Sequence, residues 1–276
     1  MNKQCLVNSG TNVKFSILVI LIMTLMLITG CENPLLSPGP QPSYFDKQEF
    51  HPLLNIFGVL RPGTQNGMGL SFIHLEKSFP FNSYPDSVEI KDAQVTLYRY
   101  EMNVIVDSLI FIYTDFDSTF KKLEYRHQEF FPQARERYGI SCRNEGYPEL
   151  TSQTTMPSIP VIIDDTVQRV GTLYTFSIRR DSLAELYDIT LWDGEKTHFQ
   201  RLRRPETGNI DVEFHLDDNY HSEGILFIYV YDSKLAEYLA YNVSIKPNTY
   251  RAEYSTVNNG FGCFGSLNML EKTVFF

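Results

Sequence analysis

Stretches in which apolar and polar residues alternate recur along most of this chain, and they constrain its fold more than any other feature of the sequence. In the clearest, Ala93–Tyr100 (AQVTLYRY), every second residue from Ala93 to Leu97 is apolar. A period of two places successive side chains on opposite faces of an extended chain, so the pattern predicts strands with one buried face. The 17 Tyr and 20 Phe residues favour the same structure, because aromatic side chains suit half-buried pleated surfaces. We therefore expect an all-β protein.

Strand-like runs follow one another at short intervals, and turn residues such as Asp193-Gly194 separate them. The predicted strands are residues 53–60, 69–75, 93–100, 104–113, 138–142, 151–157, 173–178, 187–192, 210–216 and 224–231. One segment differs, because Leu235 and Leu239 lie at helical spacing and predict a short helix near residues 233–241. Many short strands with few helices are typical of β-sandwich modules.

The first 31 residues match an export signal that ends in a lipid-attachment site. An uninterrupted apolar run, Phe15–Ile28, follows a polar start that carries two lysines. Its length fits the apolar region of a signal peptide, about 7–15 residues, and is short for a membrane-spanning helix of about 20. The run leads into Ile28-Thr29-Gly30-Cys31, a lipobox in which small residues admit the signal peptidase and the Cys31 thiol takes a diacylglycerol.

Cleavage before Cys31 frees an amine that can take a further acyl chain such as palmitate, and several chains together anchor a protein firmly. Residue 32 is Glu rather than the Asp that retains lipoproteins in the inner membrane of enteric bacteria. We therefore expect a lipid anchor in the outer membrane, with the leaflet left open. The alternative is an uncleaved N-terminal anchor with an incidental cysteine.

Prolines mark the further divisions of the chain. Residues 32–50 contain four prolines, which block helix and favour extended chain, so this segment is expected to be a semi-rigid tether. Pro157 and Pro160 mark a second boundary, after which the strand pattern restarts. The expected parts are a signal peptide (1–30), a lipidated cysteine with its tether (31–50), an N-terminal β-sandwich module (51–160) and a C-terminal β-sandwich module (161–276).

The charge of the chain excludes two classes of partner. The net charge is −9, and removal of residues 1–30, which contain Lys3 and Lys14 and no acid, leaves 22 basic against 33 acidic residues, or −11. Nucleic-acid binding and electrostatic docking on anionic lipid both require a basic surface. We therefore expect no nucleic-acid partner and attachment to the membrane through the lipid on Cys31.

Two cysteines remain for the body of the protein, because Cys5 lies in the signal and Cys31 carries the lipid. An exported protein meets an oxidising compartment, so a disulfide between Cys142 and Cys263 is permitted. Two cysteines that are distant in sequence do not reveal their separation in space. Two buried free thiols are therefore the alternative.

A search for catalytic and metal-binding motifs finds none in the required context. No two histidines have zinc-ligand spacing, and the sequence contains no G-x-S-x-G, C-x-x-C or P-loop motif. Asp217–Gly224 is acidic but fits no standard calcium-loop spacing, so it is expected to be a solvated turn. The histidines are His51, His74, His127, His198, His215 and His221. We expect no cofactor, no metal and no catalytic residues.

One glycine motif, Gly260–Gly265 (GFGCFG), has the G-x-G-x-x-G spacing of dinucleotide sites. That motif opens a helix in a βαβ unit of about 30 residues, with an acid about 20 residues further on. Only eleven residues follow Gly265, so a dinucleotide site is excluded. We expect a glycine-rich turn or bulge beside a strand, where glycine allows an unusual φ or a close backbone approach.

Four stretches together resemble an uncharacterised family of Bacteroidota outer-membrane lipoproteins. Asn55–Leu60 follows soon after the lipidated cysteine, and Ile90–Leu97 is similar to the A-x-V-x-L strand of transthyretin-like and carboxypeptidase-regulatory-like domains. Tyr138–Pro157 is similar to the family's Y…T-x-x-P close of the first module, and Val257–Gly265 to its C-terminal N-x-x-G-x-G-x-F-G. The resemblance implies a transthyretin-like or carboxypeptidase-regulatory-like sandwich followed by an immunoglobulin-like or fibronectin-like one.

The genes of this family commonly accompany TonB-dependent receptors, which implies an accessory role in nutrient uptake, and the family supplies no catalytic residues. We expect a non-enzymatic outer-membrane lipoprotein that binds a ligand, a TonB-dependent receptor or another outer-membrane protein. One alternative is an adhesin or pilus-like subunit, which predicts polymers or strand donation to a neighbour. Another is an envelope hydrolase, which predicts two carboxylates facing each other across a deep cleft.

Overall fold

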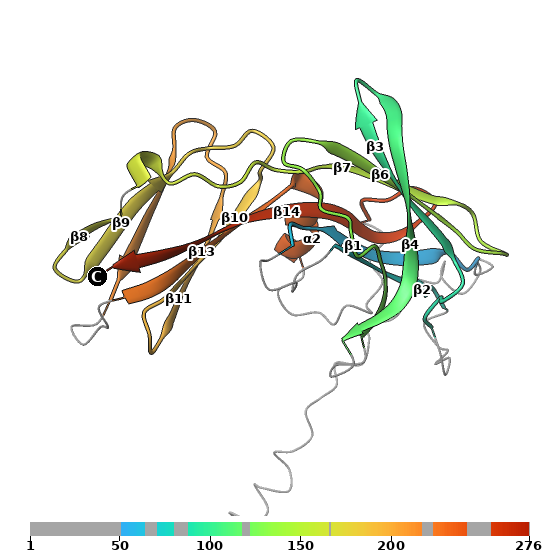
Figure 1. Ribbon diagram of the computed structural model, residues 1–276, viewed down its shortest axis with the longest axis horizontal. Helices are drawn as coiled ribbons and strands as arrows, with labels where there is room; N and C mark the ends of the chain where they lie inside the picture. The colour runs from blue at the N-terminus through green and yellow to red at the C-terminus, as the bar shows by residue number, and fades with distance from the viewer. Residues whose placement is uncertain are drawn as a thin grey trace, which may run out of the picture. The chain divides into compact units, whose positions relative to one another are not determined.

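The computed structural model is almost entirely built of β-strands (Figure 1). It describes residues 51–63, 71–79, 88–117, 122–165, 167–216, 223–241 and 255–275. The all-β class predicted from the alternating sequence is confirmed. The short helix predicted near residues 233–241 is α2, Ser233–Tyr241.

The described strands form two sheets. One has eleven strands in the order β11-β10-β13-β14-β1-β2-β5-β4-β3-β6-β7, and the other has the order β12-β9-β8. The strands are β1 Leu54–Leu60, β2 Phe72–Lys77, β3 Gln94–Glu101, β4 Val104–Asp117, β5 Lys122–Arg126, β6 Arg137–Arg143, β7 Leu150–Thr155, β8 Gln168–Val170, β9 Leu173–Ile178, β10 Leu186–Trp192, β11 Thr197–Arg203, β12 Ile210–His215, β13 Glu223–Tyr231 and β14 Gly260–Phe275.

The first part of the eleven-stranded sheet folds over its own core by means of the long strand β4. The first half of β4 pairs with β3 up to Phe111, and its second half pairs with β5 from Ile112 onward. One strand thus belongs to two differently directed parts of the sheet, which is how corners form in β-sandwiches. The apolar face predicted for Ala93–Tyr100 is confirmed, because Val95 and Leu97 are fully buried in this core.

The second part is a two-layered sandwich. Strands β9 and β12 pack against β10 and β13, and the buried residues between the layers form one cluster that includes Phe176, Ile189, Phe214 and Ile228. In β12 buried and exposed residues alternate strictly, as a period-two sequence predicts. The two clusters divide near residue 160, but His51–Phe276 forms one compact unit, so the boundary between modules at 160–161 stays a prediction.

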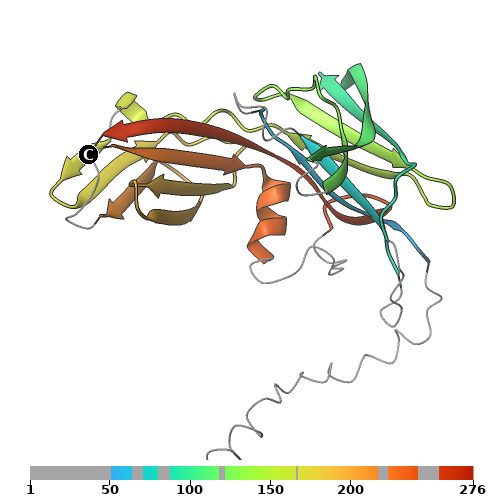
Figure 2. The same ribbon diagram turned by 60° about the horizontal axis from the view of Figure 1, so that its bottom comes forward.

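Strand β14 is shared by both clusters. Its residues Gly260–Ser266 pair in parallel with β1, and Leu267–Phe275 pair antiparallel with β13 (Figure 2). At Gly262, φ is +100° and a Cβ atom would lie 1.9 Å from the Ile56 carbonyl oxygen, so only glycine fits. The G-x-G-x-x-G segment is therefore itself part of a strand, so the turn or bulge predicted there is wrong. The unusual φ and the close backbone approach predicted for its glycines are confirmed at Gly262.

Helix α2 packs on β14 through a small third cluster. Leu235 and Cys263 are buried in it, and Phe57 and Tyr238 contact each other with ring centroids 5.4 Å apart. Asp232 caps the helix, because its Oδ1 accepts a hydrogen bond from the Leu235 amide at 2.8 Å. The cap fixes the position at which β13 gives way to the helix.

Candidate functional site

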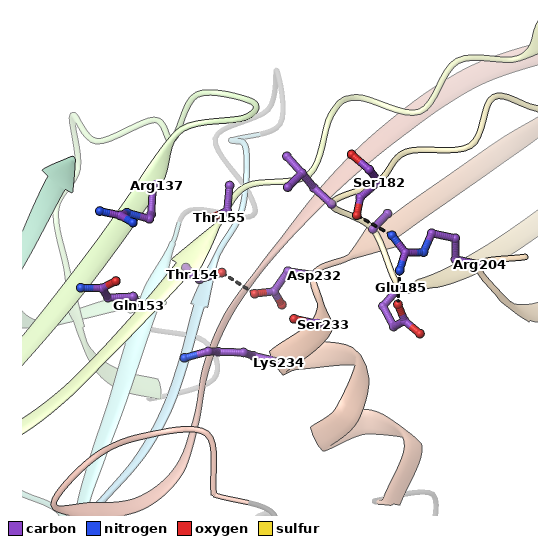
Figure 3. A pocket seen from close by; sticks show the side chains of 12 residues that line it. Arg137, Gln153, Thr154, Thr155, Ser182, Glu185, Arg204, Asp232, Ser233 and Lys234 are labelled. Carbon is purple, nitrogen blue, oxygen red and sulfur yellow. Dashed lines mark hydrogen bonds and ion pairs between the residues drawn. The ribbon is translucent and has the colours of Figure 1, made fainter. Parts of the chain in front are cut away.

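Two adjoining hollows lie where β7 meets the start of α2. The first, of about 500 Å³, is lined by residues of β6 and β7, the start of α2, residues 182–185 and Arg204 (Figure 3). The second, of about 410 Å³, lies on the face of β3, β6 and β7 opposite to the core. Gln153 and Lys234 line both, so the hollows meet at these two side chains.

Asp232 is buried in the wall of the first hollow. Its carboxylate accepts hydrogen bonds from the Thr154 hydroxyl and from the Leu235 amide. Burial raises the pKa of Asp232 to about 6, although these hydrogen bonds and nearby Lys234 oppose the shift. Asp232 thus joins α2 to β7.

An ion pair occupies another wall of the first hollow. Arg204 donates to Glu185 Oε2 at 3.0 Å and also to the backbone carbonyl of Ser182 (Figure 3). Glu185 and Asp232 are the two carboxylates that line this hollow, and both are engaged by other side chains.

A stacked arginine also links the two hollows, because Arg137 lines the first and Tyr100 lines the second. The Arg137 guanidinium lies over the Tyr100 ring, 4.9 Å from its centroid. Tyr100 leans over Gly139, where a Cβ atom would lie 2.7 Å from the ring. In the sheet register Arg137 lies between Tyr100 and Thr155, and Gly139 lies between Tyr98 and Gln153. These side chains therefore share one face of the sheet.

Lys234, in the first turn of α2, lines both hollows. Its Nζ donates to the Ser152 hydroxyl and to the Thr256 carbonyl, both at 3.2 Å. Figure 3 shows Arg137, Gln153 and Lys234 in the lining of the first hollow. Within the described part of the chain, neither Arg137 nor Lys234 has a carboxylate at ion-pair distance, whereas Glu149 of the second hollow pairs with Arg143 at 3.0 Å.

A different kind of candidate site is the first half of β4. Residues Val104–Phe111 pair with β3 on one side, and in the described ranges no strand pairs with their other side. The edge is apolar, because large hydrophobic side chains are exposed at Met102, Val104, Ile105, Val106, Ile110 and Ile112. The β3–β4 hairpin also extends past the end of β6, which stops opposite Tyr100 (Figure 1). We call residues 104–111 the β4 edge.

The cysteines in the described ranges are both free and buried. Cys142 belongs to the core under β3 and β6, and Cys263 to the cluster under α2, so the disulfide weighed from the sequence is not formed. Burial raises the pKa of both thiols, which keeps them protonated. They act as small hydrophobic side chains.

The histidines in the described ranges are dispersed. His74 binds Glu76 at 2.9 Å, a contact that raises the pKa of His74, and His198 binds Asp193 at 2.9 Å. Among the described residues no three His, Cys, Asp or Glu side chains gather as metal ligands. None of the described helices has the length and apolar character needed to cross a membrane.

Several predicted features lie outside the described residues. These are the lipidation site Cys31 with its signal and tether, the acidic turn at Asp217 and Asp218, and His221. The anchor therefore remains a prediction.

The residues that line the two hollows were not predicted from the sequence. Lys234 and its acceptor Ser152 are 82 positions apart, and Arg137 resembles any other strand arginine until β3 and β6 are paired. The β4 edge had a readable signal, since apolar residues at Val104, Ile105 and Val106 break the alternation that a half-buried strand shows.

No protein-family model matches this chain, and no curated protein matches it in sequence. Solved structures match this chain as well. One is the alpha chain of the chicken interferon gamma receptor, with 6% identity and a TM-score of 0.22, over 74% of this chain and 91% of that one.

Proposed function

We propose that this chain is a non-enzymatic, lipid-anchored protein of the outer membrane that binds a partner by adding a strand to the β4 edge. The observation that supports this is the edge itself, which combines unpaired backbone groups with exposed apolar side chains. Pairing of an extended segment there would satisfy the backbone hydrogen bonds and bury Val106 and Ile110.

An open apolar edge is a liability for a protein that works alone. Soluble proteins shield their sheet edges with charges, prolines, bulges or covering loops, because such edges recruit other chains. The β4 edge carries one charged residue, Asp107, along seven positions from Val104 to Ile110. Large exposed apolar patches mark sites of protein–protein contact.

The partner that fits best is an outer-membrane protein, in the first place a TonB-dependent receptor. The lipobox at Cys31 supports attachment to that membrane, and the family resemblance supports an association with such receptors. The net charge of −11 without residues 1–30 favours a contact made by apolar side chains and backbone over electrostatic attachment to anionic lipid. A second copy of the chain is the alternative occupant, which would make the protein a polymerising subunit.

The test is a capture experiment with the full chain, extracted from envelopes in mild detergent. The wild type is compared with Val106→Lys/Ile110→Lys, which charges the β4 edge. The matched control is Val170→Lys, on strand β8 of the other sheet, where the valine is 74% exposed. We expect the wild type and the control to retain a TonB-dependent receptor or another outer-membrane protein, and the double variant to lose it.

The remaining outcomes discriminate as well. If the wild type self-associates in sedimentation and the double variant does not, the polymerising role replaces the proposed one. If all three proteins retain the same partner, or none retains any and all stay monomeric, docking on the β4 edge is refuted.

The membrane attachment has its own test. Cys31→Ser removes the thiol that takes the diacylglycerol, so the variant is expected to stay unacylated and unprocessed. Mass spectrometry of the N-terminal peptide checks this, and normal processing of the variant would overturn the lipoprotein assignment.

A further inference from the structure

The two adjoining hollows carry an inference that is independent of the β4 edge. We propose that Arg137, Gln153 and Lys234 bind the oxyanion of a small organic carboxylate or phosphate at the place where the hollows meet.

The two hollows offer space for a small ligand. The hollows have volumes of about 500 and 410 Å³ and share Gln153 and Lys234 in their linings, so one ligand can contact both. Small-molecule sites are concave regions with a few polar groups that converge. The side chains of Arg137, Gln153 and Lys234 all line the first hollow (Figure 3).

The charged side chains that line the hollows differ in their partners. The carboxylates of the linings are all occupied: Asp232 by Thr154, Glu185 by Arg204 and Glu149 by Arg143. Arg137 and Lys234, in contrast, form no ion pair among the described residues, and Lys234 lies near the buried Asp232 carboxylate. Both cations line the first hollow of a chain whose net charge is −9, and positive charges in a cleft attract an anion.

Arg137 and Lys234 are both held in position by neighbouring groups. Arg137 is stacked on Tyr100, and Gly139 leaves the space in which the Tyr100 ring lies. Stacking holds the guanidinium plane while leaving its edge free for a bidentate contact with an oxyanion. Lys234 is held by its bonds to Ser152 and Thr256, which use two of its three N–H donors. The remaining donor and the Gln153 amide complete the set.

The experiment measures binding of inorganic phosphate and of citrate to the detergent-purified full chain by isothermal titration, against chloride at equal ionic strength. We expect one of the two anions to bind with a Kd of about 1 mM or below at one site per chain. Arg137→Gln and Lys234→Gln are each expected to weaken it roughly tenfold, the typical effect of removing a charge-assisted hydrogen bond. Arg137→Lys keeps the positive charge but lacks the planar guanidinium, so its affinity for the anion should lie between those of the wild type and Arg137→Gln.

The matched control is Lys91→Gln, which removes one exposed positive charge outside both hollows. Its affinity should equal that of the wild type, and thermal unfolding should show that every variant is folded. Equal loss in the control means general charge attraction and overturns the site. Undiminished binding in Arg137→Gln and Lys234→Gln, or no binding of either anion by the wild type, overturns it as well.

Discussion

The β10–β11 and β3–β4 hairpins differ in how well their turns are stabilised. Asp193 organises the turn between β10 and β11, because its Oδ1 accepts the amides of Glu195 and Lys196 and its Oδ2 binds His198. The turn between β3 and β4 consists of Met102 and Asn103, with φ values of 47° and 70°. Left-handed backbone suits Asn or Gly but not Met, and Met102 is 99% exposed.

The strands that follow these turns, β11 and β4, differ in how their edges are protected from pairing with other chains. Strand β11 ends the sheet with Arg201 and Arg203, and the first pairs with Asp188 at 2.7 Å. Charges of this kind protect an edge from unwanted pairing. The β4 edge has an unfavourable turn residue and apolar side chains instead. The contrast favours the proposal that β11 remains an edge, whereas the β4 edge is covered by a partner.

The largest effect is expected at Asp232, whose role contrasts with that of Asp193. Its pKa of about 6 lies above the ordinary 3.8, so folding favours the protonated acid. Its contribution to stability is greatest below pH 4 and is lost as pH rises through 6, on the order of 3 kcal/mol in all. Asp232→Asn should remove this pH dependence, measured by chemical unfolding between pH 4 and 7. An unchanged slope in the variant would show that Asp232 is not the group responsible.

Asp193→Ala tests the well-formed hairpin. Burial alone would raise the pKa of Asp193, but hydrogen bonds from Lys196, His198 and Glu195 lower it to about 2. The carboxylate therefore stabilises the fold above pH 4, and this contribution is lost as pH falls toward 2. We expect a loss of about 2 kcal/mol in the free energy of unfolding at pH 7. A loss below about 0.5 kcal/mol, the size of an ordinary surface substitution, would remove the proposed difference between the turns.

Met102→Asn tests the poorly formed hairpin. Asparagine tolerates the left-handed backbone of this turn, so we expect a gain of about 0.5–1 kcal/mol in the free energy of unfolding. Thermal unfolding beside Met102→Leu, which keeps an apolar side chain at the tip, provides the comparison. Destabilisation by Asn would mean that Met102 makes contacts that support the fold, and its exposure would then need another explanation.

The smallest effect on stability is expected for Val106→Lys/Ile110→Lys. Both side chains are exposed, so charging them should change the free energy of unfolding by no more than about 0.5 kcal/mol. The prediction separates a role in binding from a role in the core. A loss of more than about 2 kcal/mol in chemical unfolding would assign these residues to the core and contradict the comparison of the two edges.

Much of the fold could be predicted because the signal is local. Alternation identifies β3, β9, β12 and β13 directly, and helical spacing identifies α2. Strands β5, β8 and β11 were not predicted, because residues 122–126, 168–170 and 197–203 are mostly polar and are strands through their partners. The full length of β14 was missed for a similar reason, since the glycines at its start suggest a turn until β1 lies beside them.

The candidate sites depend on contacts that sequence spacing does not contain. The first hollow is lined by Arg137 of β6, Gln153 of β7 and Lys234 of α2. Strand pairing and the hydrogen bonds of Asp232 with Thr154 and of Lys234 with Ser152 bring them together. The free thiols illustrate the same limit. Cys142 and Cys263 were compatible with a disulfide in sequence, and their separation into two clusters is a property of the fold.

Amide hydrogen exchange on intact envelopes tests the central claim most directly. The exchange of a peptide covering residues 104–111 is compared between envelopes and the purified protein, with a peptide covering residues 197–203 of β11 as the internal reference. Strand addition predicts strong protection of the β4 peptide in envelopes, loss of that protection in Val106→Lys/Ile110→Lys, and equal exchange of the β11 peptide in both settings. Equal exchange of the β4 peptide in envelopes and in solution would contradict the account.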